Sequence, residues 1–180
     1  MNQAEQIQLM LNRTAELAAG SSTLRGQGPP GTIFKAREFL KDVSPQQFKL
    51  QSAVDFRKQL DVVTQSLSAH FLKQNWGAAR KVLNIFLRDV LYNRYLCDHF
   101  NFESVENWLE VPLDGDVAEN LLAASEGKSL PSWPRIKRLT VEVSDQYQSV
   151  ARKIAEKENI ATVHLDLIFW RRKKQANETI

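Results

Sequence analysis

Cysteine and histidine are scarce in this chain of 180 residues, which has one cysteine, Cys97, and three histidines. A single cysteine excludes an intramolecular disulfide, which fits a reducing compartment. It also excludes a cysteine-ligated iron–sulfur cluster or a Cys-rich zinc site. The histidines (His70, His99 and His164) lie far apart, without the His-x-x-x-His spacing that binds a metal on a helix. The sequence therefore predicts no metal site, and it predicts structural or surface roles for the histidines.

Long apolar runs and glycine-rich phosphate loops are also missing. No run approaches the roughly 18 apolar residues of a membrane-spanning helix, and the first residues lack the basic and apolar regions of a signal peptide. Four of the seven glycines lie within residues 20–31, but they do not form the pattern of a P-loop. These absences predict a soluble, cytoplasmic protein that contacts no membrane and needs no cofactor.

The composition that remains is ordinary for a globular protein, with 43% hydrophobic and 25% charged residues. The length suits one domain with a substantial core and is short for two, and we expect a monomer. The 24 Lys and Arg residues against 21 Asp and Glu residues give a net charge of +3. This mild positive balance permits a nucleic-acid partner without demanding one.

Apolar residues recur at helical spacing along most of the chain, and no segment alternates as a strand does. The predicted helices cover residues 3–19, 32–43, 45–73, 76–96, a segment after Asp114, 141–158 and 161–173. Residues 20–31 are predicted to be a loop, and Ser44-Pro45 is a start signal for the helix that follows. We therefore predict a single compact all-α domain of about seven or eight helices. Residues 1–72 would form its N-terminal part and residues 73–174 the part that carries function.

The segment NWGAARKVLNIFLRDVLYN (residues 75–93) places Lys81 in the first turns of an apolar helix. The positive end of the helix dipole and the neighbouring Arg80 both oppose a second positive charge there. They would favour the neutral amine, which is the form that acts as a nucleophile. The alternative is a solvated lysine whose stem covers a core helix.

The segment VPLDGDV (residues 111–117) places Asp114 at the start of the next predicted helix. Its side chain can cap that helix, and capping alone would explain the residue. Pro112 fixes the approach of the chain, and Gly115 leaves open space beside the carboxylate. The alternative is that Asp114 is a carboxylate held in place for chemistry.

Taken together, these segments resemble the helix–hairpin–helix DNA glycosylases, and in particular the archaeal 8-oxoguanine glycosylase branch. VPLDGDV resembles the aspartate motif of that superfamily. Lys81 lies where bifunctional members carry their Schiff-base lysine. VHLDLIFW (residues 163–170) resembles the final helix of the archaeal branch. The resemblance covers about residues 75–172 in the same order. Two departures are the GAA of residues 77–79, where the hairpin usually has Gly-x-Gly, and Asp116, where a histidine is common.

The resemblance implies a helix–hairpin–helix-like element and an enzyme that flips a damaged or modified base out of double-stranded DNA and excises it. Asp114 would then be a catalytic carboxylate. Lys81 would be a nucleophile that forms a Schiff base and cleaves the abasic strand; otherwise water takes its place. Trp76 and Trp133 are candidate walls of the base pocket, with Tyr92 and Trp108 as weaker ones. The candidate contacts to the DNA backbone are Gly77, Arg80, Lys137 and Arg138.

The substrate stays open at this point. It could be an oxidised purine such as 8-oxoguanine, or a bulky modified pyrimidine of the kind found in phage DNA, and the role would then be repair or phage defence. An alternative from another class is a helical DNA-binding module without catalysis, and a third is a helical scaffold that binds no DNA. The basic runs PRIKRL (residues 134–139) and RRKK (residues 171–174) fit a DNA partner, but such runs are common on solvated surfaces.

Overall fold

The computed structural model describes residues 1–71, 75–125 and 130–170, and all the regular structure in these ranges is helical, as predicted. The α-helices are α1 (Gln3–Ala18), α2 (Ser21–Leu24), α3 (Thr32–Lys41), α4 (Ala53–Ser68), α5 (Trp76–Tyr92), α6 (Arg94–Phe100), α7 (Gly115–Ala123) and α8 (Val141–Glu158). Short 3-10 helices cover η1 (Pro45–Phe48), η3 (Phe102–Trp108), η4 (Ile136–Arg138) and η5 (Thr162–His164). Residues 165–170 are also helical. Within the described ranges, no helix is long and apolar enough to cross a membrane.

Most of the longer helices begin at a polar side chain that accepts a hydrogen bond from the backbone of the first turn. Asn2 and Glu5 form a reciprocal capping box at α1. Ser52 caps α4, Asn75 caps α5 and Thr140 caps α8. Each such cap stabilises its helix by about 1 kcal/mol. Polar residues at these positions therefore fix where the helices start.

Three sequence predictions fail at helix boundaries. Ser44-Pro45 starts only the short η1, because the chain leaves helical geometry at Lys49 and Ser52 provides a second cap for α4. The helix predicted over residues 76–96 is divided at Asn93, which ends α5 and whose side chain caps α6. Residues 20–31 are not all loop, since Ser21–Leu24 make one helical turn whose Leu24 is buried.

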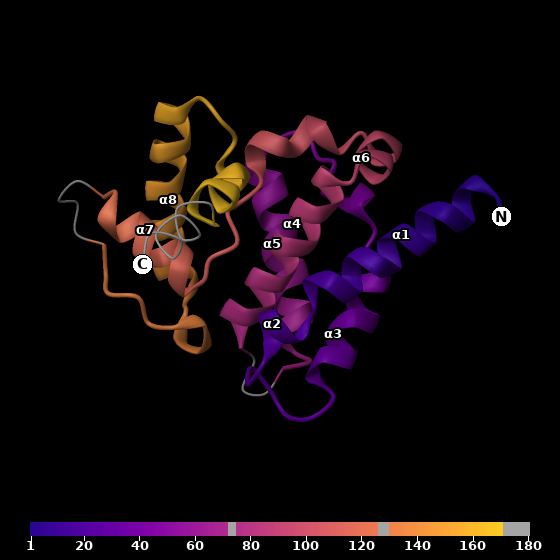
Figure 1. Cartoon of the computed structure of the whole chain (residues 1–180), viewed down its shortest axis with the longest axis horizontal. Coiled ribbons are helices and arrows are strands. Elements are labelled where there is room, and N and C mark those ends of the chain that lie inside the picture. The colour runs from indigo at the N-terminus through magenta and orange to yellow at the C-terminus, as the bar shows by residue number, and fades with distance from the viewer. Residues whose placement is uncertain (72–74, 126–129, 171–180) are drawn as a thin grey trace, which may run out of the picture.

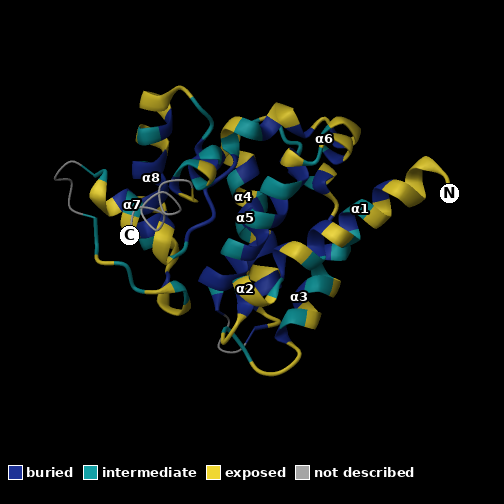
Figure 2. Cartoon of the chain, viewed as in Figure 1, coloured by how far each residue is buried: buried dark blue, intermediate teal, exposed yellow. Residues whose placement is uncertain are grey.

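The apolar side chains form two clusters that meet beside α5. One cluster lies among α1, α3, α4, α5, α6 and η3, and the other lies among α7, α8 and residues 165–170. α5 runs through the middle of the molecule, with α1 and α3 on one side and α7 and α8 on the other (Figure 1). Its apolar stripe is dark blue in Figure 2 because side chains such as Phe86 and Leu83 are fully buried. One domain therefore has two cores that share α5 as a common support.

The two clusters are held together by close backbone packing and by a buried ionic network. Ile136 of η4 packs against both clusters. A Cβ on Gly77 would lie 2.3 Å from the carbonyl oxygen of Ile136, so only glycine allows η4 to approach α5 this closely. In the ionic network, Arg57 of α4 donates hydrogen bonds to Glu110 at 2.9 Å and to Asp145 of α8 at 2.6 Å.

Candidate functional site

Lys81 and Asp114, which lie 33 positions apart in the sequence, form an ion pair at the junction of the two clusters. The Nζ atom of Lys81 is 3.2 Å from Oδ2 of Asp114. The Lys81 side chain is 16% exposed and that of Asp114 is 35% exposed. The two residues that sequence analysis singled out for chemistry are therefore in contact, at a position that solvent reaches.

The two carboxylate oxygens of Asp114 have separate partners. Oδ1 accepts a hydrogen bond from the backbone amide of Val117 at 2.9 Å, which caps α7, while Oδ2 faces Lys81. The preceding residues Val111 and Leu113 are buried in the second cluster and hold the backbone that carries Asp114. Capping therefore orients Asp114 and leaves one oxygen available.

A second ion pair lies beside the first on the same face of α5. Arg88, seven residues after Lys81, binds both Asp89 and Asp166. Burial raises the pKa of Asp166, and the charge of Asp114 acts in the same direction, while Arg88 and Lys81 oppose the shift. Lys81, Arg88, Asp114 and Asp166 thus influence one another electrostatically. Asp166 belongs to VHLDLIFW, the third segment of the sequence resemblance.

Trp133, a predicted wall of the base pocket, lies next to this site. A Cβ on Gly115 would be 4.0 Å from the indole Nε1 of Trp133, so the ring stands beside the residue that follows Asp114. The Trp133 ring meets the buried ring of Tyr147 edge-on, with 5.3 Å between the centroids. Trp133 is only partly buried, so it combines a fixed orientation with an exposed surface.

Trp76, the other predicted pocket wall, packs against the second cluster. It is partly buried, and the guanidinium of Arg80 lies 5.2 Å from the centre of its ring. This cation–π contact uses one face of the indole. Trp76 therefore belongs to the packing at the start of α5.

Arg80 does not occupy the position predicted for a DNA contact. Its side chain is 2% exposed, and its guanidinium binds Glu110 at 2.9 Å, Thr64 at 2.9 Å and Asp61 at 2.8 Å. Burial alone would raise the pKa of Glu110, but Arg80, Arg57 and Asn84 hold that pKa below its usual value. Arg80 is therefore an internal counter-ion, and its buried guanidinium has no exposed charge to offer a DNA phosphate.

Gly77 is likewise buried, beneath η4, so its role is close packing and not an open amide that grips phosphate. Lys137 and Arg138 lie on η4 itself and are both exposed. Since η4 packs on the first turn of α5, these two cations stand near the start of the helix that carries Lys81. The basic run of residues 171–174 lies outside the described residues.

Sequence reasoning missed a chain of three polar side chains at the other end of α5. The hydroxyl of Tyr92 lies 2.9 Å from Nδ1 of His164, and Nε2 of His164 lies 2.8 Å from a carboxylate oxygen of Glu106. Burial raises the pKa of Tyr92 to about 12, so the phenol stays protonated at neutral pH. The only sequence signal is the position of Tyr92, eleven residues after Lys81, which places both on one face of the helix.

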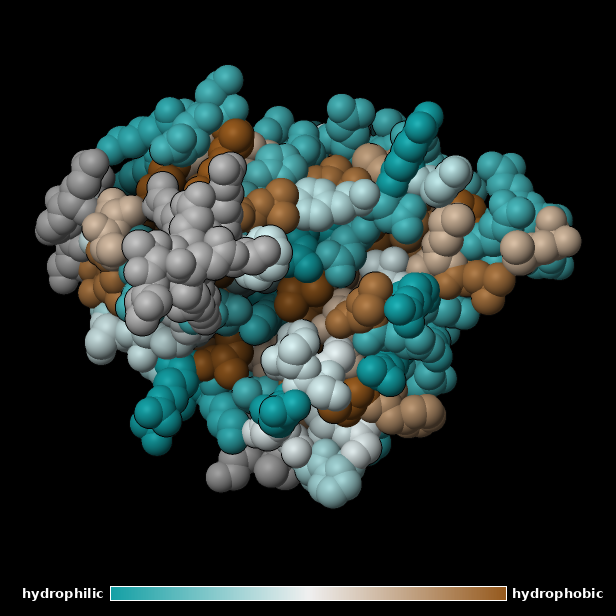
Figure 3. All heavy atoms as spheres, in the orientation of Figure 1, coloured by the Kyte–Doolittle hydropathy of each residue, from teal (hydrophilic) through white to brown (hydrophobic). Residues whose placement is uncertain are grey.

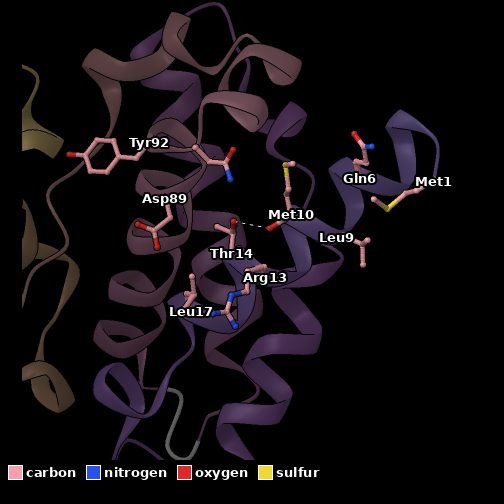
Figure 4. A pocket seen from close by; sticks show the side chains of 10 residues that line it. Met1, Gln6, Leu9, Met10, Arg13, Thr14, Leu17, Asp89 and Tyr92 are labelled. Carbon is pink, nitrogen blue, oxygen red and sulfur yellow. Dashed lines mark hydrogen bonds between the residues drawn. The ribbon is translucent and has the colours of Figure 1, made fainter.

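A cavity of about 620 Å³ opens beside Tyr92, between α1 and the C-terminal half of α5 (Figure 4). Its walls include Met10, Arg13, Thr14, Leu17, Asp89 and Tyr92. Among the described residues, no group of three or more His, Cys, Asp or Glu side chains is arranged to hold a metal ion. The charged cluster at Lys81 and this cavity are therefore the features of α5 that suit a ligand.

Comparison with known proteins finds no family model, no curated protein and no solved structure that matches this chain. The resemblance to helix–hairpin–helix DNA glycosylases thus depends on the three sequence segments alone. The contact between Lys81 and Asp114, and the position of Asp166 beside them, are independent of that resemblance.

Proposed function

We propose that the protein is a DNA glycosylase in which Asp114 and Lys81 carry out the chemistry. The observation that supports this most directly is the 3.2 Å contact between Nζ of Lys81 and Oδ2 of Asp114. The two residues come from separate elements, and both were selected for the same reaction from their sequence motifs.

In the proposed reaction, Oδ2 of Asp114 accepts a proton from the Lys81 ammonium, and the neutral amine attacks C1′ of the flipped nucleotide. The bond from C1′ to the base breaks, and the base leaves with the electron pair and takes up a proton. The sugar ring opens as the C1′–Nζ bond becomes a Schiff base. β-Elimination then transfers a C2′ proton to water and breaks the C3′–O bond to the 3′ phosphate, which nicks the strand. If water attacks C1′ in place of Lys81, only the base is released.

The charge of the site supports this assignment. Three carboxylates (Asp89, Asp114 and Asp166) face two cations (Lys81 and Arg88), so the cluster carries an excess of negative charge. Positive charge builds on the deoxyribose as the glycosidic bond breaks, and carboxylates fixed beforehand in a partly dry site stabilise it. Asp114 needs no reorientation, because its other oxygen is held by Val117.

The proposed substrate is double-stranded DNA with a modified base, bound by a monomer. Lys137 and Arg138 are exposed cations of η4, which packs on the first turn of α5, and they would contact phosphates. A helix–hairpin–helix-like element would consist of α4, the connection that follows it, and α5. Residues 72–74 of that connection lie outside the described residues.

A non-catalytic DNA-binding module is the second candidate. The observation that favours it is that Asp114 already has two structural tasks, the cap and the ion pair. A helical protein that bound DNA without chemistry would keep the exposed cations of η4 and would not need the Lys81–Asp114 contact for affinity.

Borohydride trapping separates the two candidates. Labelled duplexes would carry 8-oxoguanine, uracil, an alkylated purine, glucosylated hydroxymethylcytosine or a plain abasic site, and strand scission after hot alkali would be scored in parallel. We expect a trapped complex on at least one duplex that is lost in Lys81→Ala. Scission should fall by at least about a hundredfold in Asp114→Asn, as for loss of a catalytic group. Lys153→Ala, an exposed lysine of α8, is the matched control and should behave as wild type.

Alkali-dependent scission without trapping would mean that water is the nucleophile and that Asp114 activates it. Tight DNA binding with neither trapping nor scission on any duplex would reject the glycosylase and leave the binding module. The absence of salt-sensitive DNA binding as well would reject both.

A further inference from the structure

The cavity beside Tyr92 lies on the same side of α5 as the Lys81–Asp114 pair. Lys81, Arg88 and Tyr92 are separated by seven and four residues, so they form one stripe along the helix. Arg88 connects the charged site with the cavity, because it binds Asp166 next to Lys81 and also Asp89 in the wall of the cavity. The charged site and the cavity are therefore neighbours along one face of α5, with Arg88 between them.

The distance along the helix limits what could occupy both places. Asp89 is eight residues beyond Lys81 and Tyr92 is eleven, which correspond to about 12 and 16 Å of helix axis. From this spacing we expect an unsubstituted base whose C1′ lies at the Lys81 amine to stop short of the cavity. We expect a base that carries a substituent of several heavy atoms, pointed away from the sugar, to reach it.

The walls of the cavity combine apolar surface with oriented polar groups. Met10 and Leu17 of α1 provide apolar contact, and α1 and α5 meet on a face where apolar and polar side chains alternate (Figure 3). The Tyr92 hydroxyl is held by His164, which Glu106 holds in turn, so the Tyr92 ring has a fixed position in the wall of the cavity. Arg13 is exposed and has no hydrogen bond or ion pair within the described residues, and its guanidinium offers several donors.

Burial raises the pKa of Asp89. The Oδ1 atom of Asp89 accepts two hydrogen bonds from the guanidinium of Arg88. An aromatic ring, a carboxylate and a guanidinium around an apolar floor suit a ligand with several hydroxyl groups and a hydrophobic face. A sugar has both. A plain oxidised purine offers nothing that would use Arg13 and Tyr92 at this distance from the reacting carbon.

We propose that this cavity receives the sugar of a glycosylated hydroxymethylpyrimidine, and that Arg13, Asp89 and Tyr92 determine the preference for that substrate. The inference rests on the proposed glycosylase function, since it assigns the substrate class of the same site. It selects the bulky modified pyrimidine over the oxidised purine, and it assigns to α1 a role in recognition.

The test compares duplexes that differ only in the sugar. One carries glucosylated hydroxymethylcytosine, the second carries hydroxymethylcytosine, and the third carries a stable tetrahydrofuran analogue of an abasic site for binding alone. Leu17→Trp fills the cavity from an exposed position of α1, and Arg13→Gln removes the free cation. Gln8→Trp adds the same indole at a position of α1 that does not line the cavity and is the matched control.

We expect wild type to excise the glucosylated base at least about tenfold faster than the unglucosylated one, which is the lower end of the effect of one hydrogen bond to a charged group. Leu17→Trp and Arg13→Gln should each reduce the ratio of the two excision rates about tenfold or more. Both variants should bind the abasic analogue as tightly as wild type does, and Gln8→Trp should keep the wild-type ratio. Excision of hydroxymethylcytosine or 8-oxoguanine in preference to the glucosylated base would overturn the inference and leave the glycosylase standing. An unchanged preference in Leu17→Trp would also overturn it. Failure to excise any base, with the abasic analogue still bound, would overturn the glycosylase itself.

Discussion

Arg80 and Lys81 are adjacent in the sequence, but their cations have partners on different sides of α5. The guanidinium of Arg80 binds Glu110 inside the protein, and the ammonium of Lys81 binds Asp114 at a position that solvent reaches. Glu110 and Asp114 are four residues apart on one extended segment, so this segment supplies a buried partner and then a partly exposed one. The internal pair fixes how α5 and the segment lie, and this arrangement places the second pair.

The two tasks of Asp114 predict that two substitutions will have different effects. Asparagine caps helices as well as aspartate does, so Asp114→Asn should keep the stability of the protein within about 0.5 kcal/mol while it removes the proton acceptor. Asp114→Ala loses the cap as well and should lower the free energy of unfolding by about 1 kcal/mol. Urea unfolding measures both variants. Equal stability losses in the two would show that the cap seen in the structure does not contribute.

The Arg80–Glu110 pair predicts a dependence of stability on pH. The pKa of Glu110 is held low in the folded state. The ionised Glu110 therefore contributes fully to the free energy of unfolding at pH values above its pKa in the unfolded chain. That contribution is lost as the pH falls through its pKa in the folded protein. Glu110→Gln removes the buried charge partner of Arg80 and leaves only the partly exposed Asp61 opposite it, so it should cost about 3 kcal/mol or more at pH 7. The difference from wild type should narrow as the pH is lowered below about 4.

Urea unfolding at pH 7, 5, 4 and 3 tests this dependence. Glu103→Gln, at an exposed position of η3, is the control and should stay close to wild type at each pH. If the free energies of unfolding of Glu110→Gln and wild type differ by the same amount at pH 7 and pH 3, the low pKa of Glu110 is contradicted.

The contrast between Gly77 and Gly115 predicts opposite outcomes for the same substitution. Gly77→Ala places a Cβ 2.3 Å from the Ile136 carbonyl oxygen, and separating η4 from α5 should cost about 1–3 kcal/mol. The nearest atom to a Cβ at Gly115 is 4.0 Å away, and this residue begins α7. Gly115→Ala should therefore be neutral or stabilise by up to about 1 kcal/mol. Thermal unfolding of the two variants, side by side, checks the prediction; similar changes would argue against the close packing of η4.

The exposed cations of η4 predict a change in DNA binding and not in fold. Lys137→Gln with Arg138→Gln should weaken binding to a modified duplex and to an unmodified duplex by similar factors. It should also reduce the slope of log affinity against log salt by about 2 if each cation contacts one phosphate. Fluorescence anisotropy at several salt concentrations measures the slope. An unchanged slope would show that the DNA lies against another face.

Much of the fold could be predicted because its helices are coded locally. The apolar spacing of residues 141–158 and the threonine before them define α8 with the bounds that the structure has. The same holds for Asp114, whose position after Val111 and Pro112 marks the start of α7. By contrast, Ser44-Pro45 is a genuine cap and proline signal, but nothing local shows that the helix ends four residues later and begins again after Ser52.

Only those residues of the candidate site that lie in sequence motifs could be predicted. Lys81 and Asp114 could be named from their segments, and they are in contact. Arg80 was assigned to the surface because it is a cation at a helix start, and its partners Thr64 and Glu110 come from elements that sequence alone does not place. Gly77 is an analogous case, since its close neighbour is a backbone atom 59 positions further along the chain. The pairing of Tyr92 with His164 also depends on tertiary packing.

The position of α5 between the two cores has a consequence for control of the proposed reaction. Lys81 is carried by a helix whose buried face belongs to the first cluster, and Asp114 is carried by a segment anchored in the second. The separation of Nζ and Oδ2 therefore reports how the two halves of the domain sit against each other. A ligand that wedges the halves apart, or an added bulk at the Ile136 contact, would slow the reaction from a distance without touching either reacting side chain.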